Sequence, residues 1–145
     1  MVNIMKNKIL FLGMLFSFLS CSNKNDFDNV VAEKFEQCGK STDCLIDFSS
    51  LMWFEWDTMC FYSGANSLED INKDLGFELK EFTDIGDRVI FLNKGKVVYQ
   101  KEWFPEPSKP TKGTVFITDF KKMRLPKSEA KFKIRKEEQA YYLEK

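Results

Sequence analysis

The 145-residue chain contains no histidine. This absence excludes Ser-His-Asp and Cys-His nucleophile systems, the paired-histidine zinc motif of metallopeptidases and every histidine general base. The sequence also lacks a phosphate-binding P-loop, a dinucleotide-binding glycine motif and the G-x-S-x-G motif of serine hydrolases. Catalysis would have to run on carboxylates, lysine, tyrosine or a serine–lysine pair. We therefore expect a non-catalytic protein without a cofactor.

Apolar runs long enough to cross a membrane are absent as well. The run Ile9–Leu19 has eleven residues and would span about 16 Å as a helix, roughly half of a hydrocarbon core. Lys6 and Lys8 precede it, and no acidic residue occurs before Asp26. A basic start followed by a short apolar stretch is typical of a secretory signal, so residues 1–20 are predicted to be a signal peptide.

The apolar run leads into Phe18-Leu-Ser-Cys21, which resembles the lipobox of bacterial lipoproteins: apolar residues and a small residue before a cysteine. The resemblance implies cleavage before Cys21, a thioether-linked diacylglycerol on its sulfur and usually a further acyl chain on its amine. Several acyl chains, at about 0.8 kcal/mol per buried methylene, hold a protein firmly on a bilayer. Ser22 comes next, and under the sorting rule of many Gram-negative bacteria the lack of aspartate there implies the outer membrane.

Cleavage would leave a mature chain of 125 residues with a net charge of −2, because Lys6 and Lys8 are lost. That length suits one ordinary domain with its own core. Residues 21–26 are interpreted as a short lipidated tether, and residues 27–145 as a single domain. The predicted location is the bacterial cell envelope, with a membrane reached through the lipid on Cys21.

Three further cysteines, Cys38, Cys44 and Cys60, can oxidise outside the cytoplasm. Cys38 and Cys44 flank a turn-rich spacer that can bring their Cα atoms within the roughly 4.4–6.8 Å that a disulfide requires. A disulfide is predicted between these two, with Cys60 as a buried thiol; a bond from Cys60 to either of them stays open. Three thiols without a histidine make a poor zinc site, so no metal is predicted.

Two short helices are predicted. Residues 26–37 carry apolar side chains at helical spacing with charged ones opposite, and Gly39 follows as a C-cap. Residues 67–76 begin with Ser67 as an N-cap, carry acidic residues in the first turn and close on Gly76. Both apolar stripes are interpreted as faces that pack on a core.

An aromatic strand is predicted over residues 54–62. One of its faces would hold Phe54, Trp56, Thr58, Cys60 and Tyr62. A hairpin follows over residues 88–103, with a turn at residues 93–96 in which Gly95 supplies a positive φ. Residues 89–92 are apolar on both faces, which favours a central strand.

Prolines interrupt the sheet pattern over residues 104–110 and predict an extended loop. Strand character returns at residues 114–118 and 130–135, and residues 139–143 are predicted to form a last edge strand. These elements predict one α+β domain, in which two short helices pack on an antiparallel β-sheet.

The middle of the chain carries a second resemblance, over roughly residues 45–100. The strings Phe54-Glu-Trp-Asp57, Ser67-x-Glu-x-Ile-x-x-x-Leu-Gly-Phe77 and Phe91-Leu-Asn-Lys-Gly-Lys-Val-Val98 are similar to those of small uncharacterised bacterial lipoproteins, in which an F-x-W-D strand precedes a short helix ending in L-G. The resemblance implies location and fold and brings no activity. Trp56 and Asp57 are interpreted as a core indole and a carboxylate that binds local backbone donors.

Charge is segregated along the mature chain. Residues 21–108 have a net charge of −8 and residues 109–136 a net charge of +8. The basic block suits anionic lipid headgroups or an acidic envelope protein, whereas nucleic acid does not suit the compartment. Equally, alternating cations are what the solvated face of an antiparallel strand looks like. The candidate anion- or partner-binding side chains are Lys121, Lys122, Lys131, Lys133 and Arg135.

Three functions are compatible with these patterns. The first is an envelope lipoprotein whose domain is a non-catalytic binding or scaffolding module. The second is a periplasmic inhibitor or immunity-type protein that blocks an enzyme or toxin through the loop at residues 103–110. The third is a carboxylate enzyme built on Glu55 and Asp57, which would need opposed environments in a closed pocket.

Overall fold

The structure is a computed structural model that describes residues 25–39, 41, 43–119 and 121–145. The predicted signal peptide and Cys21 lie outside the described residues. None of the helices in the described part of the chain has the length and apolar character that a membrane span requires. The predicted α+β class is confirmed, since the described residues form two α-helices and eight strands in one small domain.

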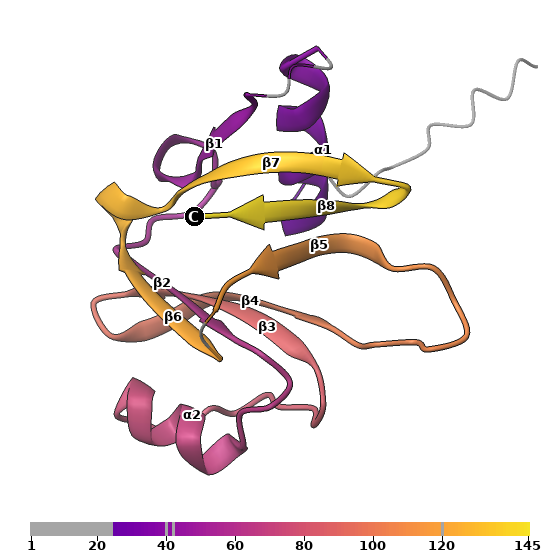
Figure 1. Cartoon of the computed structure of the whole chain (residues 1–145). Helices are drawn as coiled ribbons and strands as arrows, with labels where there is room; N and C mark the ends of the chain where they lie inside the picture. The colour runs from indigo at the N-terminus through magenta and orange to yellow at the C-terminus, as the bar shows by residue number, and fades with distance from the viewer. Residues whose placement is uncertain (1–24, 40, 42, 120) are drawn as a thin grey trace, which may run out of the picture.

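The elements follow one another in the order drawn in Figure 1. The α-helices are α1 (Phe27–Gln37) and α2 (Leu68–Leu75). Short 3-10 turns occur at Phe48–Ser50 and Lys127–Glu129. The strands are β1 (Leu45–Asp47), β2 (Thr58–Tyr62), β3 (Asp87–Asn93), β4 (Lys96–Trp103), β5 (Lys112–Ile117), β6 (Lys122–Pro126), β7 (Lys131–Glu137) and β8 (Gln139–Glu144).

The strands divide into two four-stranded sheets, where the sequence pattern indicated one. The first sheet has the order β1-β7-β8-β5 and the second has the order β4-β3-β2-β6. Neighbouring strands are antiparallel except for β5 and β8, which are parallel. As predicted, β3 is a central strand, because residues 89–92 must be covered on both faces.

Two clusters of buried side chains hold these layers together. The larger lies between the sheets and is rich in aromatic rings; Phe27 at the start of α1 sits among Phe48, Phe91, Trp103 and Phe116, with ring centroids 4.9–6.0 Å apart. The smaller cluster lies on the other face of the second sheet, under α2. Figure 1 shows α2 below that sheet and α1 beside the first sheet at the opposite end.

Two strand predictions are wrong. Residues 54–57 are irregular, and β2 starts at Thr58, because this segment carries the chain from one sheet to the other. As a result Trp56 faces the cluster between the sheets, whereas Cys60 faces α2. The strand at the carboxyl end, β8, is not an edge strand. It pairs with β7 on one side, and β5 pairs in parallel with its other side.

Two strands were missed, the short β1 and β6. β6 pairs with β2 along its whole length, from Tyr62 opposite Lys122 to Thr58 opposite Pro126. Its sequence, Lys-Met-Arg-Leu-Pro, has few residues with strand preference and ends in proline. Proline is tolerated there because β6 is an edge strand of the second sheet and Pro126 is its last residue.

Candidate functional site

The amino end of the described domain is fixed by a cluster of carboxylates against β4. Asp26, the last residue of the expected tether, accepts a hydrogen bond from Lys101 Nζ at 2.6 Å. The Tyr99 hydroxyl lies 3.4 Å from the same carboxylate and accepts the backbone N–H of Phe27 at 3.0 Å. The backbone is therefore fixed to the sheet where α1 begins, five residues after Cys21.

Asp28 completes this cluster. Its carboxylate accepts hydrogen bonds from the Thr114 backbone N–H at 2.9 Å, the Thr114 hydroxyl at 2.7 Å and the Trp103 indole N–H at 3.0 Å. Lys101 Nζ lies 3.0 Å from its other oxygen. Gly113 makes room for it, since a Cβ there would fall 2.9 Å from the carboxylate, and the backbone has φ +76°. Asp28 thus joins α1, β4 and β5.

Asp26 and Asp28 share the one ammonium group of Lys101 in this cluster. Burial lowers the pKa of Lys101, but the hydrogen bonds to Asp26 and Asp28 outweigh burial and raise the pKa overall. Burial raises the pKa of Tyr99. Each of its three charged groups is engaged in an ion pair, so the cluster fixes the start of α1 to the sheet.

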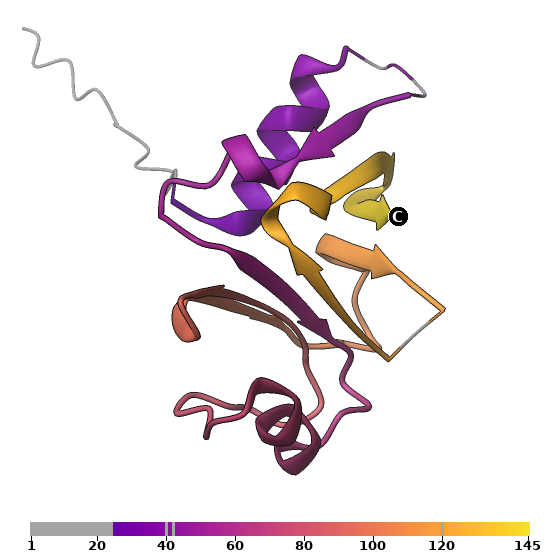
Figure 2. The same ribbon diagram turned by 90° about the vertical axis from the view of Figure 1, so that its left-hand side faces the viewer.

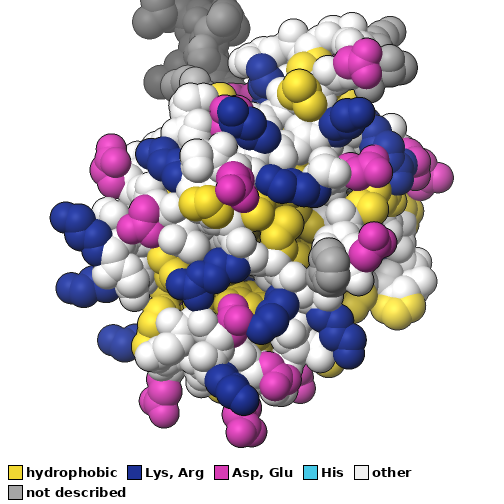
Figure 3. All heavy atoms as spheres, turned by 60° about the vertical axis from the view of Figure 1, so that its left-hand side comes forward, with side chains coloured by type: hydrophobic (Ala, Val, Ile, Leu, Met, Phe, Trp, Pro, Cys, Tyr) yellow, Lys and Arg dark blue, Asp and Glu magenta, His cyan; other side chains and the backbone are white. Residues whose placement is uncertain are grey.

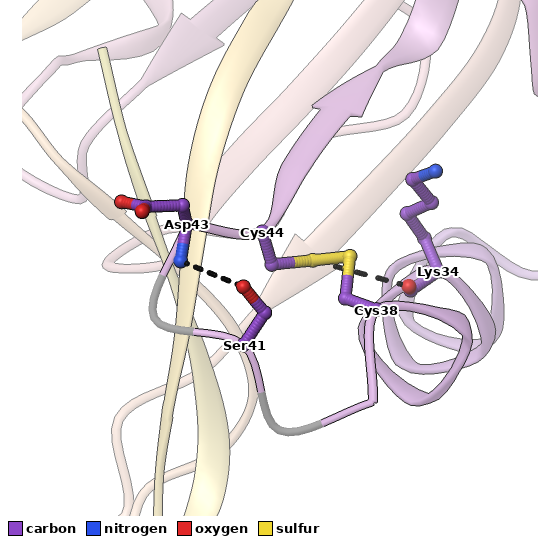
Figure 4. Close-up of a disulfide and its surroundings, with 5 residues drawn as sticks. All are labelled: Lys34, Cys38, Ser41, Asp43 and Cys44. Atoms are coloured by element: carbon purple, nitrogen blue, oxygen red, sulfur yellow. Dashed lines mark hydrogen bonds between the residues drawn. A yellow bond between two sulfur atoms is a disulfide. The ribbon is translucent and has the colours of Figure 1, made fainter.

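The predicted disulfide is present: Cys38 and Cys44 are bonded, with their Cα atoms 5.6 Å apart. Figure 4 shows the bond joining the end of α1 to the residue before β1, with the Lys34 carbonyl 3.9 Å from the Cys44 sulfur and the Asp43 N–H bonded to the Ser41 hydroxyl. Cys60 is a buried free thiol, as predicted, and burial raises its pKa. A raised pKa keeps the thiol protonated and unreactive.

The five candidate basic residues are not brought together. Lys122 is the first residue of β6 in the second sheet and Lys121 immediately precedes it, whereas Lys131, Lys133 and Arg135 lie on the exposed face of β7 in the first. Three of the five have acidic partners: Lys122 binds Asp74 at 2.6 Å, Lys131 lies 3.5 Å from Asp47, and Arg135 pairs with Glu137. Figure 3 shows dark blue and magenta side chains interleaved over this side of the molecule.

The β7 residues form the clearest remaining basic feature. Lys131, Lys133 and Arg135 alternate with the buried Phe132 and Ile134, the pattern of a strand with one solvated face. No acid lies within ion-pair distance of Lys133 or Lys121 in the part of the chain that the structure describes. The side chains of Lys121 and Lys133 are exposed and available to a partner.

Glu55 and Asp57 do not form a catalytic pair. Both side chains are exposed. Asp57 accepts the Lys94 backbone N–H at 2.6 Å and the Thr58 hydroxyl at 2.7 Å. The bond from the Lys94 backbone is the main cause of a lowered Asp57 pKa. Asp57 therefore closes the β3–β4 turn, where Lys94 and Gly95 have positive φ, and its partner is distant in sequence rather than local.

Two further features had no sequence signal. Arg88 is fully buried beneath the loop before β3, where it donates to the Thr83 and Gly86 carbonyls and lies 3.3 Å from Glu102. A groove of about 680 Å³ runs between residues 77–81 and the first half of β4. The partners of Arg88 and the walls of the groove come from separate segments, so no local pattern predicts them.

Within the described residues no cluster of acidic residues and cysteines has the arrangement of a metal site. Comparison with known proteins gives no family: no family model, no curated protein and no solved structure matches this chain.

Proposed function

We propose that this protein is a lipoprotein of the bacterial envelope, anchored through acylated Cys21, and that its domain is a non-catalytic binding or scaffolding module. The Cys38–Cys44 disulfide is the observation that supports this most directly, because disulfides persist in exported proteins and are rare in the cytosol. The hydrogen bond between Lys101 and Asp26 adds support, because it fixes the backbone to the domain a few residues after the cysteine and leaves only a short tether. The proposed location is the outer membrane, and the proposed partners are the bilayer itself and an envelope protein or anionic lipid.

Acylation can be tested by growing bacteria that express the full chain with labelled palmitate. We expect the membrane-bound protein to carry the label and to have lost residues 1–20. Cys21→Ser should abolish both the label and the cleavage, because the thioether needs the cysteine sulfur. Cys60→Ser is the matched control and should keep the label, since Cys60 is buried in the fold. Label retained by Cys21→Ser would rule out the proposed anchor.

The loop after β4 supports a second candidate, an inhibitor or immunity-type protein. Residues 104–110 are exposed throughout, and Phe104 leaves 48% of its surface in solvent. Trp103, which precedes the loop, is held by Asp28, so the loop projects from a fixed base. A stoichiometric enzyme or toxin should then copurify with the protein and be lost on Phe104→Ala. Retention of such a partner by this variant would reject the loop as the contact.

A further inference from the structure

Three exposed apolar side chains lie on β4 or on the segment that packs against it. Trp53, Val97 and Val98 leave 41%, 38% and 40% of their surfaces in solvent. Val97 and Val98 belong to β4, the last strand of its sheet, and Trp53 packs edge-on against Tyr99 with ring centroids 5.3 Å apart. These three residues are called the β4 edge patch below. Lone apolar residues on a surface are ordinary, but neighbouring ones mark a contact surface.

A bulge in β4 explains why both valines face solvent. Phe91 pairs with Tyr99, but Leu92 pairs with Val97, which leaves Val98 without a partner on β3. The extra residue turns the strand locally and disturbs the ladder along its outer edge. Such an edge is poorly suited to pairing with another strand. Apolar contact is therefore the interaction that this edge favours.

The tether enters the domain beside this patch. Tyr99, which packs against Trp53, also accepts the Phe27 N–H and lies 3.4 Å from the Asp26 carboxylate. Figure 2 shows the amino end of α1, the segment before β2 and the β3–β4 hairpin along the same side of the molecule. Asp26 is five positions after Cys21, and a fully extended chain over five positions reaches about 17 Å.

We propose that the β4 edge patch rests on the bilayer surface when Cys21 is acylated, with the Trp53 indole among the lipid headgroups. The inference rests on the proposed lipoprotein anchor. A tether this short keeps Asp26, and with it the adjoining edge, close to the membrane. Tryptophan prefers the membrane interface because it combines a large apolar ring with a polar N–H.

Charge distinguishes this surface from the basic face of β7. The charged residues nearest to the patch in the sequence have both signs: Lys94 and Lys96 beside the two valines, and Glu55 and Asp57 after Trp53. Contact through the patch should then occur on neutral phosphatidylcholine and persist at high salt. Contact through Lys131, Lys133 and Arg135 would instead require anionic lipid and weaken as salt is added.

The test uses the acylated full-length protein, purified from membranes and reconstituted in phosphatidylcholine vesicles with or without bromine on the acyl chains. Bromine quenches indoles near the acyl region. We expect tryptophan emission to fall by about a third in brominated vesicles, because Trp53 is one of three tryptophans and occupies the interface, whereas Trp56 is buried. Trp53→Phe should remove most of this quenching without releasing the protein.

A matched control moves the reporter to another face. Leu45 is 59% exposed and lies opposite Lys133 on β7. The double variant Trp53→Phe, Leu45→Trp should show little quenching. Two results would overturn the proposed docking face and leave the anchor intact. One is quenching of the tryptophan at position 45. The other is a wild-type protein that floats with the vesicles but shows no quenching. Failure to acquire lipid at all would instead reject the proposed function itself.

Discussion

The two helices begin in different ways. α2 begins with a local capping box: the Ser67 hydroxyl accepts the Asp70 N–H, and the Asp70 carboxylate accepts the Ser67 N–H. α1 has no side-chain cap bond at Asp26, and its first-turn acid, Asp28, binds Trp103 and Thr114, which lie 75 and 86 residues further along the chain. One helix start is thus fixed by its neighbours in sequence and the other by the folded domain.

This difference matters for the whole molecule because α1 is where the proposed tether joins. A helix held by local contacts can form before the rest of the domain, but it gives no resistance when its end is pulled. A helix held by β4 and β5 transmits a pull on Asp26 into the sheets. The carboxylate cluster therefore couples Asp26 to the core, which local capping could not do.

The sharpest test of the comparison removes the first-turn aspartate from each helix. In the mature chain carrying Cys21→Ser, we expect Asp28→Ala to lower the free energy of unfolding by about 3 kcal/mol, because several donors lose a charged acceptor. Asp70→Ala should lower it clearly less, since it removes one of the two hydrogen bonds of a solvent-exposed cap. Urea unfolding at neutral pH measures both. Equal losses would erase the distinction between the helices.

The disulfide at the carboxyl end of α1 should contribute less to the free energy of unfolding than Asp28 does. The disulfide closes a loop between residues six apart, and loop-closure entropy assigns such a bond about 2 kcal/mol. Reduction of the native protein should lower the free energy of unfolding by that amount in urea titrations with and without a thiol-free reductant. The variant Cys38→Ala, Cys44→Ala should not respond to reductant, because Cys60 has no partner. If reductant also destabilised that variant, the Cys38–Cys44 bond would not be the cause of the loss of stability.

Much of the fold was predictable because its signals are local. Ser67 and Gly76 fixed the ends of α2, Gly95 fixed the hairpin turn, and the short spacer between Cys38 and Cys44 indicated their bond. Expectations failed where partners are remote. β8 ceased to be an edge because β5 pairs with it in parallel, and residues 54–57 left the sheet because the chain crosses there between sheets.

The candidate site divides in the same way. The alternation of Lys131, Lys133 and Arg135 with apolar residues predicted the exposed face of β7 correctly. It did not reveal that Lys121 and Lys122 lie in the other sheet, or that Lys122 is bound by Asp74. The role of Asp28 had no signal at all, since an aspartate in a first helical turn is ordinary and its partners become visible only in three dimensions.

The sequence by itself determined the class of the domain, the ends of its second helix and its hairpin turn, and it favoured the pairing of Cys38 with Cys44. Each of these depends on residues a few positions apart, for which backbone geometry and hydrogen bonding are settled locally. Only the tertiary structure decided the division into two sheets, the burial of Arg88, the partners of Asp28 and the position of the β4 edge patch beside the tether. These depend on side chains brought together from distant segments, and burial and long-range pairing fix them only when the whole domain folds.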